Sequence, residues 1–370
     1  SRIRADPSVR NRNPTQQRMK KKIISTLLAG AVSLGGVFSV SASEYTGDPV
    51  KARLASEEIE GDFMTVWAER FADHMYEWSD GKIEIEVYPY GTLGATGDIN
   101  ELAQLGVVEF VFSDYAWISA FVPQAQVLAL NYLFPGEQVP QVLDHMMQNG
   151  DFFPLLQKHF RDNGLLPMSV LYEGWQWVTT NEPVTSPESL RGQKLRVMSS
   201  KLLVEDYKAY GASPTPMSYG EVYGALQTGL IDGQVNPLFA IYSMKFFENQ
   251  EYITQMWNEP FIGIPTVNLD FYNNLTPDAQ QEMLDYWQSA IIPAGDWIEK
   301  RNASDMEKMM DEKPSLEFIY LTDEQIQPFE ERAKQVYPTF VEIGGDGAQE
   351  ILDAVLADIA AAEKALGIGQ

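Results

Sequence analysis

Strand-like and helix-like segments alternate along most of this chain, and that order limits the folds open to it. Residues 62–80 place apolar side chains at every third or fourth position, from Phe63 to Trp78, as one face of a helix does. A turn then leads into residues 83–88, where apolar and polar residues alternate as in a half-buried strand. A helix over 100–106 and an apolar strand over 107–112 continue the β-α-β order of a largely parallel sheet. We therefore predict an α/β fold.

The rest of the chain repeats this order and indicates two lobes. Proline lacks the N–H of the helical ladder, so Pro293 should interrupt or kink the helix that contains it. Gly229 should end its helix as a C-cap. No repeat or low-complexity linker separates the segments, so we expect two α/β lobes joined by several crossings. The further expected segments are strands over 51–55, 167–172 and 194–197, helices over 139–163, 201–210, 219–228 and 276–313, and two surface helices over 322–366.

The first 42 residues have the pattern of a leader. Residues 1–18 show no apolar period, so we interpret them as upstream sequence and Met19 as the start. Three lysines at 20–22, an uncharged apolar stretch over 23–40 and small residues at 40–42 predict a cleaved signal peptide. A membrane-spanning helix is the alternative, but two glycines break the stretch and no positive cluster follows it. We therefore expect a mature protein in the periplasm that begins near Ser43.

Charge and cysteine content exclude several classes of protein. The chain has 27 Lys and Arg against 52 Asp and Glu, a net charge of −25. The leader holds eight of the basic residues and one acidic residue, so the mature chain is more acidic still. Nucleic acids and anionic membranes would repel such a chain, and we expect no nucleic-acid partner. The absence of cysteine excludes disulfides and thiolate chemistry, so stability must come from a buried core.

Motifs for catalysis or metal binding are not found in the sequence. Its three histidines lack metal-site spacing, and His74 falls on the apolar face of the first predicted helix, at the edge of the core. No nucleophile elbow, phosphate loop or His-Glu-x-x-His pattern occurs. We expect neither a metal nor a cofactor. A secreted enzyme acting on a small acid is the alternative class, and its candidate carboxyls are Glu58, Asp114 and Glu173.

Two residues suggest a site for a small carboxylate. Arg196 lies in the short strand 194–197, and Asn236 precedes a proline about forty residues later. A guanidinium presents a planar fork of donors that matches both oxygens of a carboxylate. The alternative is that Lys194 and Arg196 are solvated residues of an edge strand, since charged side chains are mostly exposed.

Several motifs, taken together and in order, resemble one family. They are IEIEVYPYGTLG at 83–94, LRGQKLRV at 190–197, GASPTP at 211–216, EVYGALQTG at 221–229 and DGQVNP at 232–237. They are similar to the solute-binding subunits of tripartite ATP-independent periplasmic (TRAP) transporters, over nearly the whole mature chain. Within that family, residues 55–62 and 198–203 are most similar to the receptor for ectoine, a cyclic zwitterion.

The resemblance implies a two-lobed periplasmic binding protein of type II-like α/β fold, which closes on its ligand about a hinge and delivers it to membrane permease subunits. It also implies a long helix shared by both lobes. We expect lobe I to contain residues 43–172 and about 262–290. Lobe II should contain 173–261 and about 291–370, with the C-terminal helices.

The resemblance also assigns roles to individual residues. The carboxylate-binding arginine falls on Arg196, the asparagine on Asn236 and the acidic residue of the ectoine receptor on Glu58. Aromatic walls fall on Trp117, Tyr219 and Phe239. Asp114 and Gln176 complete the predicted site.

Three departures from the family pattern bear on the ligand. Gln176 stands where many sugar-acid receptors have a second arginine, which argues against a large polyhydroxy acid. The common Gln-Glu-Asn-Pro is Gln-Val-Asn-Pro at 234–237. Trp117, Tyr219 and Ala240 are not the residues of the ectoine receptor.

Glu58 separates two interpretations of the ligand. An acid in a carboxylate-binding cleft is costly unless the ligand also carries a cation or donor, which favours a zwitterion such as ectoine or hydroxyectoine. Trp117 would then stack on its ring. Alternatively, Glu57, Glu58 and Glu60 form an exposed acidic loop, and the ligand is a small keto, aromatic or dicarboxylic acid.

Overall fold

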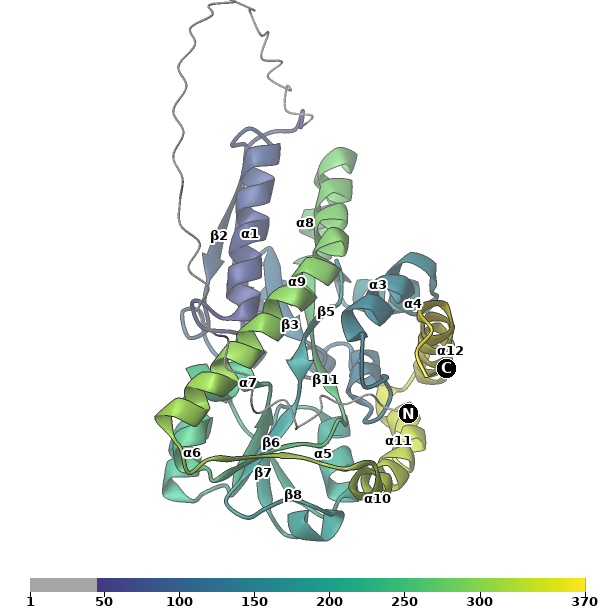
Figure 1. The fold of residues 1–370 in the computed structure, drawn as a ribbon. Helices are drawn as coiled ribbons and strands as arrows, with labels where there is room; N and C mark the ends of the chain where they lie inside the picture. Colours follow the sequence, from purple (N-terminus) through teal and green to yellow (C-terminus); the bar gives the residue numbers. More distant parts are fainter. Residues whose placement is uncertain (1–44, 370) are drawn as a thin grey trace, which may run out of the picture.

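The computed structural model describes residues 45–369, so the predicted leader and cleavage site lie outside the described residues. Strands form two sheets that lie one above the other in Figure 1. The first sheet contains β1 (Val50–Ser56), β2 (Ile83–Tyr88), β3 (Phe110–Asp114), β4 (Leu165–Pro167), β5 (Leu171–Trp175) and β11 (Pro260–Asn268). The second contains β6 (Trp177–Thr180), β7 (Lys194–Val197), β8 (Ser213–Pro216), β9 (Gly233–Asn236), β10 (Tyr252–Gln255) and β12 (Glu317–Tyr320). We call the two halves built on these sheets lobe I and lobe II.

Each sheet is mixed rather than largely parallel. β1 pairs in parallel with β2 and β3, and β7 pairs in parallel with β8 and β9, as β-α-β units require. β11 runs antiparallel to β3, β4 and β5, and β6 runs antiparallel to β9 and β10. These antiparallel strands flank two of the crossings between the lobes, at residue 176 and over 256–259. After each of these crossings, the first strand of the new lobe, β6 or β11, runs antiparallel to its neighbours in the sheet.

Helices cover the sheets and connect the lobes. The α-helices are α1 (Phe63–Trp78), α2 (Thr96–Gln104), α3 (Val139–Asn149), α4 (Phe152–Arg161), α5 (Lys201–Ala209), α6 (Val222–Thr228), α7 (Leu238–Ser243), α8 (Leu269–Asn273), α9 (Pro277–Glu312), α10 (Asp323–Lys334), α11 (Tyr337–Gly344) and α12 (Ala348–Leu366). Short 3-10 helices are η1 (Trp117–Ala120), η2 (Pro123–Ala129), η3 (Pro187–Leu190), η4 (Tyr219–Glu221) and η5 (Phe246–Asn249). α1 buries Phe63, Trp67, Phe71 and Met75, the apolar face predicted from the sequence.

The long helix α9 belongs to both lobes. It packs against α1 and β5 of lobe I and against α7 of lobe II, and Figure 1 shows it running across both. Pro293 lies inside it without interrupting it, and the helix changes direction partway along its length (Figure 1). Of the two predicted effects of Pro293, interruption or a kink, the kink is confirmed. A proline inside a helix usually bends it.

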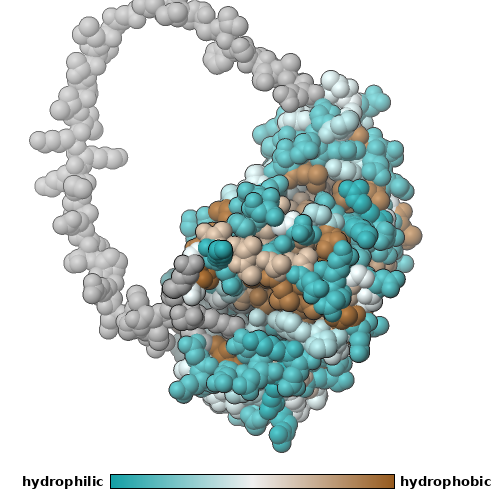
Figure 2. All heavy atoms as spheres, turned by 90° about the vertical axis from the view of Figure 1, so that its right-hand side faces the viewer, coloured by the Kyte–Doolittle hydropathy of each residue, from teal (hydrophilic) through white to brown (hydrophobic). Residues whose placement is uncertain are grey.

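Some element boundaries differ from the predictions for local reasons. The second helix spans 96–104, because Gly106 leaves the helix with φ +73°, and β3 starts only at Phe110. Residues 322–366 form three helices rather than two, because Gly345 and Gly347 adopt positive φ between α11 and α12. α12 packs against α3 and α4, and hydrophilic side chains cover much of the face shown in Figure 2. The boundaries proposed for the lobes stay a prediction.

Candidate functional site

A small buried cavity lies where the two lobes meet. Most of the side chains that line it are buried. Its polar residues follow or end strands: Glu57 and Glu58 come after β1, Asp114 ends β3, and Asn236 ends β9. Loops at the carboxyl ends of strands are where open α/β sheets bind ligands. The lining residues are Glu57, Glu58, Thr96, Asp114, Trp117, Arg196, Met198, Tyr219, Asn236, Phe239, Ala240 and Phe261.

Arg196 forms the positive pole of the cavity. Its side chain is 1% exposed, and its Nε donates to the Met217 carbonyl at 3.0 Å. Nη1 and Nη2 are buried and have no hydrogen-bond partner within residues 45–369. Burial lowers the pKa of Arg196 to about 10, against the opposing effect of Tyr219 and Asp114, so the guanidinium is charged at neutral pH. It therefore offers two parallel donors to a carboxylate, and the exposed-strand alternative is wrong.

Asn236 lies next to this pole in a fixed orientation. Its Nδ2 donates to Gln234 Oε1 at 2.5 Å, and Gln234 Nε2 in turn donates to Thr179 Oγ1 at 3.2 Å. An amide nitrogen carries two hydrogens, so Asn236 can still donate one to a ligand. The strand pairing of β9 with β6 and β7 holds this chain of amides in place.

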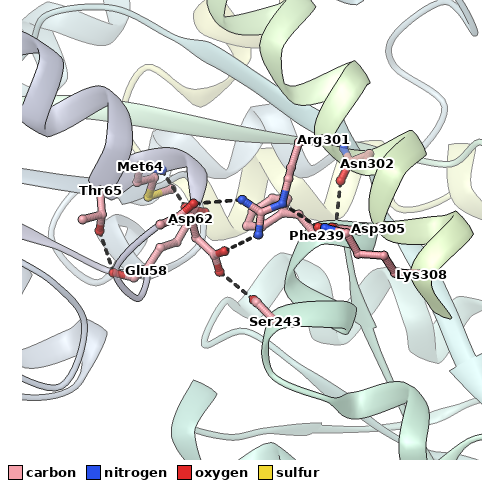
Figure 3. Close-up of polar contacts among 11 residues, drawn as sticks. Glu58, Asp62, Met64, Thr65, Phe239, Ser243, Arg301, Asn302, Asp305 and Lys308 are labelled. Atoms are coloured by element: carbon pink, nitrogen blue, oxygen red, sulfur yellow. Dashed lines mark hydrogen bonds and ion pairs between the residues drawn. The ribbon is translucent and has the colours of Figure 1, made fainter. Parts of the chain in front are cut away.

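Glu58 forms the opposite pole. Glu57 and Glu58 are 5% and 4% exposed, so the alternative of an exposed acidic loop holds only for Glu60. The Met64 N–H donates to Glu58 Oε2 at 2.7 Å, and the Thr65 hydroxyl donates to the Glu58 carbonyl (Figure 3). Glu58 Oε1 is buried and meets no N–H or hydroxyl donor in the described chain. The start of α1 thus holds one carboxylate oxygen and leaves the other for a ligand.

Four buried carboxyls form two pairs at this pole. Burial, with Asp114 beside it, raises the pKa of Glu57 well above its usual range, and Glu57 donates a hydrogen bond to Asp114. Burial raises the pKa of Glu58 to about 8, although a hydrogen bond from Glu173 opposes this. Burial also raises the pKa of Asp114, whose Oδ1 accepts the N–H groups of Ala116 and Trp117 at 2.6 and 3.1 Å. Each pair holds at least one proton at neutral pH because two adjacent carboxylates in a dry site repel.

Aromatic side chains close the cavity between the two poles. Trp117, Phe239 and Phe261 line it. Tyr219 lies with its ring centroid 6.0 Å from Arg196 Cζ. Tyr90 of lobe I packs edge-on against Tyr219, with ring centroids 5.5 Å apart, and its hydroxyl accepts the Gly220 N–H at 3.0 Å. Such walls give apolar contact and cation–π attraction to a flat or cationic ligand.

The structure brings together seven of the eight residues predicted from the sequence. Arg196, Asn236, Glu58, Trp117, Tyr219, Phe239 and Asp114 all line the cavity. Gln176 does not: it lies between β5 and β6, is 2% exposed, and hydrogen-bonds to Tyr115. It lies at a crossing between the two sheets and outside the lining of the cavity, so its role in ligand binding stays a prediction.

Sequence reasoning missed other lining residues. Glu57 was considered only as part of an acidic loop, and its burial follows from the sharp turn after β1. Met198 follows Arg196 by two positions, so its alternation with Arg196 is a usable signal. Phe261 comes from β11, which is apolar along its whole length, and nothing in the sequence singles it out.

The described chain shows neither a membrane-spanning helix nor a metal cluster. None of its helices combines the length and apolar character that crossing a bilayer requires. Residues 45–369 also contain no cluster of three or more His, Cys, Asp or Glu side chains arranged to hold a metal ion. His74 packs at the core edge, where its Nε2 lies 2.6 Å from Glu282 Oε1.

Two α/β lobes around a buried cavity with charged poles define a class of protein, the solute receptors that close on a ligand. The chain belongs to the bacterial extracellular solute-binding protein family 7, whose model matches residues 54–343. It is a periplasmic receptor and not an enzyme.

Several relatives are similar over most of their length. The ectoine/5-hydroxyectoine-binding periplasmic protein UehA of Ruegeria pomeroyi is 38% identical over 91% of this chain and 98% of its own. The periplasmic ectoine-binding protein of the TeaABC TRAP transporter of Halomonas elongata has a solved structure that is 36% identical. It superposes with a TM-score of 0.80 over 84% of this chain and all of its own. The sialic acid-binding periplasmic protein SiaP of Vibrio cholerae is 28% identical over 86% of this chain and 95% of its own.

Proposed function

We propose that this receptor binds a compact zwitterion, with ectoine or 5-hydroxyectoine as its ligand, and delivers it to the permease subunits of a TRAP transporter. One observation carries the proposal: two free guanidinium nitrogens of Arg196 and a free oxygen of Glu58 line the same buried cavity. A carboxylate on Arg196 and a cationic ring on Glu58 would each satisfy a buried polar group that otherwise stays unpaired.

Relatives and aromatic walls support the same ligand. The relatives UehA and TeaA are described as ectoine-binding proteins. Aromatic rings of Trp117 and Phe239 would cover the faces of a flat ring.

A small organic acid is the second candidate, and the raised carboxyl pKa values favour it specifically. Neutral carboxyl groups at Glu57 and Glu58 would donate hydrogen bonds to an anion instead of repelling it. On this alternative, Arg196 and Asn236 bind the acid, and Glu58 contributes no charge.

Titration calorimetry of wild type and Glu58→Gln against both ligand classes separates the candidates. A zwitterion receptor binds ectoine, and Glu58→Gln weakens it about tenfold or more, the value of a charged hydrogen bond. Simple monocarboxylates then bind weakly and respond little to the substitution. A receptor for an organic acid shows no heat with ectoine, and its acid binds Glu58→Gln as tightly as wild type. Glu60→Gln, an exposed acid in the same loop, is the matched control.

A further inference from the structure

Glu173 is a buried acidic residue next to Glu58, and no ion pair in the described chain accounts for its burial. It lies on β5 with 0% exposure, and neither of its oxygens meets an N–H or hydroxyl donor in the described part of the chain. Its carboxyl meets that of Glu58. A buried polar group that lacks other partners calls for an explanation.

The packing around Glu173 leaves space for its carboxyl because residue 263 is a glycine. Gly263 of β11 lies opposite Glu173, and a Cβ at position 263 would overlap Glu173 Oε1. The same Cβ would approach Phe112 Cε2 to 2.9 Å and Met64 Cε to 3.2 Å, so apolar atoms surround the group. Since Glu173 and Glu58 both belong to lobe I, their contact does not depend on closure of the lobes.

Among the described residues, the charged groups that act most strongly on Glu173 are acids, namely Glu58, Glu57 and Asp114. Arg301 acts on Glu58, but it bonds to the Gly61 carbonyl, Asp62 and Asp305 (Figure 3). Arg196 acts on Asp114, which belongs to the other carboxyl pair. Two ionised carboxylates side by side in this apolar setting would repel each other strongly, so one of them must hold a proton. Glu58 accepts the Met64 N–H, whereas Glu173 meets no N–H or hydroxyl donor among the described residues, so a negative charge is better stabilised on Glu58 and the proton is assigned to Glu173. Burial and the charge of Glu58 raise the pKa of Glu173 well above its usual range, in agreement with this assignment.

We propose that Glu173 is a positioning residue that remains a neutral acid and donates its proton to Glu58, so that the pair presents one negative charge to the cationic group of the ligand. This inference rests on the proposed function. It predicts that the part of the ligand that meets Glu58 carries a single positive charge. A single charge matches a singly charged ring, whereas two would favour a dication or a metal ion.

Binding should also release a proton. The charged and titratable groups around Glu58 are Glu57, Asp62, Asp114, Glu173, Tyr219, Arg196 and Arg301. Because burial raises the pKa of Glu58 to about 8, Glu58 is mostly protonated at pH 7 and must ionise to meet a cation. Calorimetry in two buffers of different ionisation enthalpy should count about one proton released per ectoine at pH 7, and about none for Glu58→Gln.

Two substitutions at 173 test the role of the donated proton. Glu173→Gln keeps a donor toward Glu58, so its affinity for ectoine should stay within about threefold of wild type. Glu173→Met removes the donor at similar length, so affinity should fall about tenfold or more. The pH at which binding is half-maximal should rise by about one unit in Glu173→Met and not change in Glu173→Gln. Equal losses in both variants would mean that Glu173 is ionised, and no loss in Glu173→Met would mean that it only fills space; either result overturns the proposal.

Infrared spectroscopy of the ligand-free receptor tests the proton without any ligand. The carbonyl stretch of a protonated carboxylic acid at pH 7 should weaken in Glu173→Gln relative to Glu60→Gln. An unchanged band overturns the proposal even if ectoine binds. A receptor that shows the band change but does not bind ectoine contradicts the proposed function instead, so the two failures are distinguishable.

Discussion

The Ser243 hydroxyl donates a hydrogen bond of 2.6 Å to Asp62 Oδ2, which joins the end of α7 in lobe II to the start of α1 in lobe I. Asp62 Oδ1 accepts from Arg301 Nη2 of α9 at 2.9 Å (Figure 3). The next residue of α9, Asn302, accepts the Phe239 N–H at 2.9 Å, directly after the Asn236-Pro237 turn. Consecutive residues of the shared helix therefore hold the loop of Glu58 and the start of α7.

Removing the Ser243 hydroxyl should speed ligand release. Ser243→Ala breaks a direct bond between the lobes across the cavity, and a hydrogen bond to a charged group corresponds to about tenfold in the dissociation rate. The association rate should change little because the open form is unaffected. Stopped-flow fluorescence of Trp117 would follow both rates. Ser289→Ala, which removes an exposed hydroxyl from α9, is the control; equal dissociation rates in both variants would contradict this role.

Closure itself should be visible in solution. The lobes touch through Asp62 and Ser243 on one side of the cavity and through Tyr90 and Gly220 on another. A ligand that bridges Arg196 and Glu58 adds contacts only when the lobes are together, so it should shift the population toward the closed form. Small-angle scattering is expected to show a smaller radius of gyration with saturating ligand. An unchanged scattering curve would exclude hinge closure under those conditions.

Arg196→Ala should abolish binding and leave the fold intact. The substitution leaves the ligand carboxylate buried without its partner, at a cost of about 3–5 kcal/mol, or two to three orders of magnitude in affinity. Burial disfavours the charged guanidinium, as the lowered pKa of Arg196 shows, so the ligand-free protein should unfold at the same temperature or a higher one. Calorimetry and thermal unfolding measure both effects. Lys194→Ala, two residues away and exposed, should bind normally. Affinity of Arg196→Ala within about threefold of wild type would refute the carboxylate clamp.

Much of the fold was predictable because local patterns and tertiary packing agree. β2 and β7 match their predicted bounds, and the apolar face of α1 is the one that packs into the core. The antiparallel strands at the crossings were not predictable from local alternation, because β11 is buried on both faces and its partners are distant in sequence.

The site was predicted unevenly for a related reason. Arg196 and Asn236 have distinctive chemistry at the ends of recognisable strands, so the sequence singles them out. The pairing of Glu173 with Glu58 joins positions more than a hundred residues apart, and only the sheet brings them together. Gln176 lies at a crossing between the sheets, where the local sequence has no alternation that would predict which way the side chain faces.

Gly263→Ala should destabilise the protein because its Cβ has no space. The added atom would overlap Glu173 Oε1 and press on Phe112, at a cost of about 1–3 kcal/mol for an overpacked core. Gly224→Ala is the control: this glycine lies in α6 with nothing within 4 Å of an added Cβ. Alanine there should stabilise the helix by about 0.4–1 kcal/mol. Urea unfolding of both variants gives the comparison, and equal free energies of unfolding would show that β11 moves aside for the methyl group.

Glu259→Gln should make the stability of the ligand-free receptor less dependent on pH. Glu259 lies between β10 and β11, where its carboxyl accepts the hydroxyls of Tyr115 from lobe I and Tyr207 from lobe II at 3.2 and 3.3 Å. Burial raises the pKa of Glu259 to about 8 from 4.5, so the folded state binds more protons than the unfolded state between these values. The free energy of unfolding should therefore fall as pH rises through this window, by on the order of 3 kcal/mol from this group.

Glutamine cannot titrate, so the variant should lose this part of the pH dependence and gain stability relative to wild type at about pH 8. Urea unfolding at several pH values from about 5 to 8 measures the slope. Glu317→Gln removes an exposed carboxyl of β12 and should leave the slope as it is in wild type. If Glu259→Gln and wild type lose stability in parallel as the pH rises, Glu259 is already ionised at about pH 5. In that case the hydrogen bonds from Tyr115 and Tyr207, which lower the pKa of Glu259, would outweigh the effect of burial, which raises it.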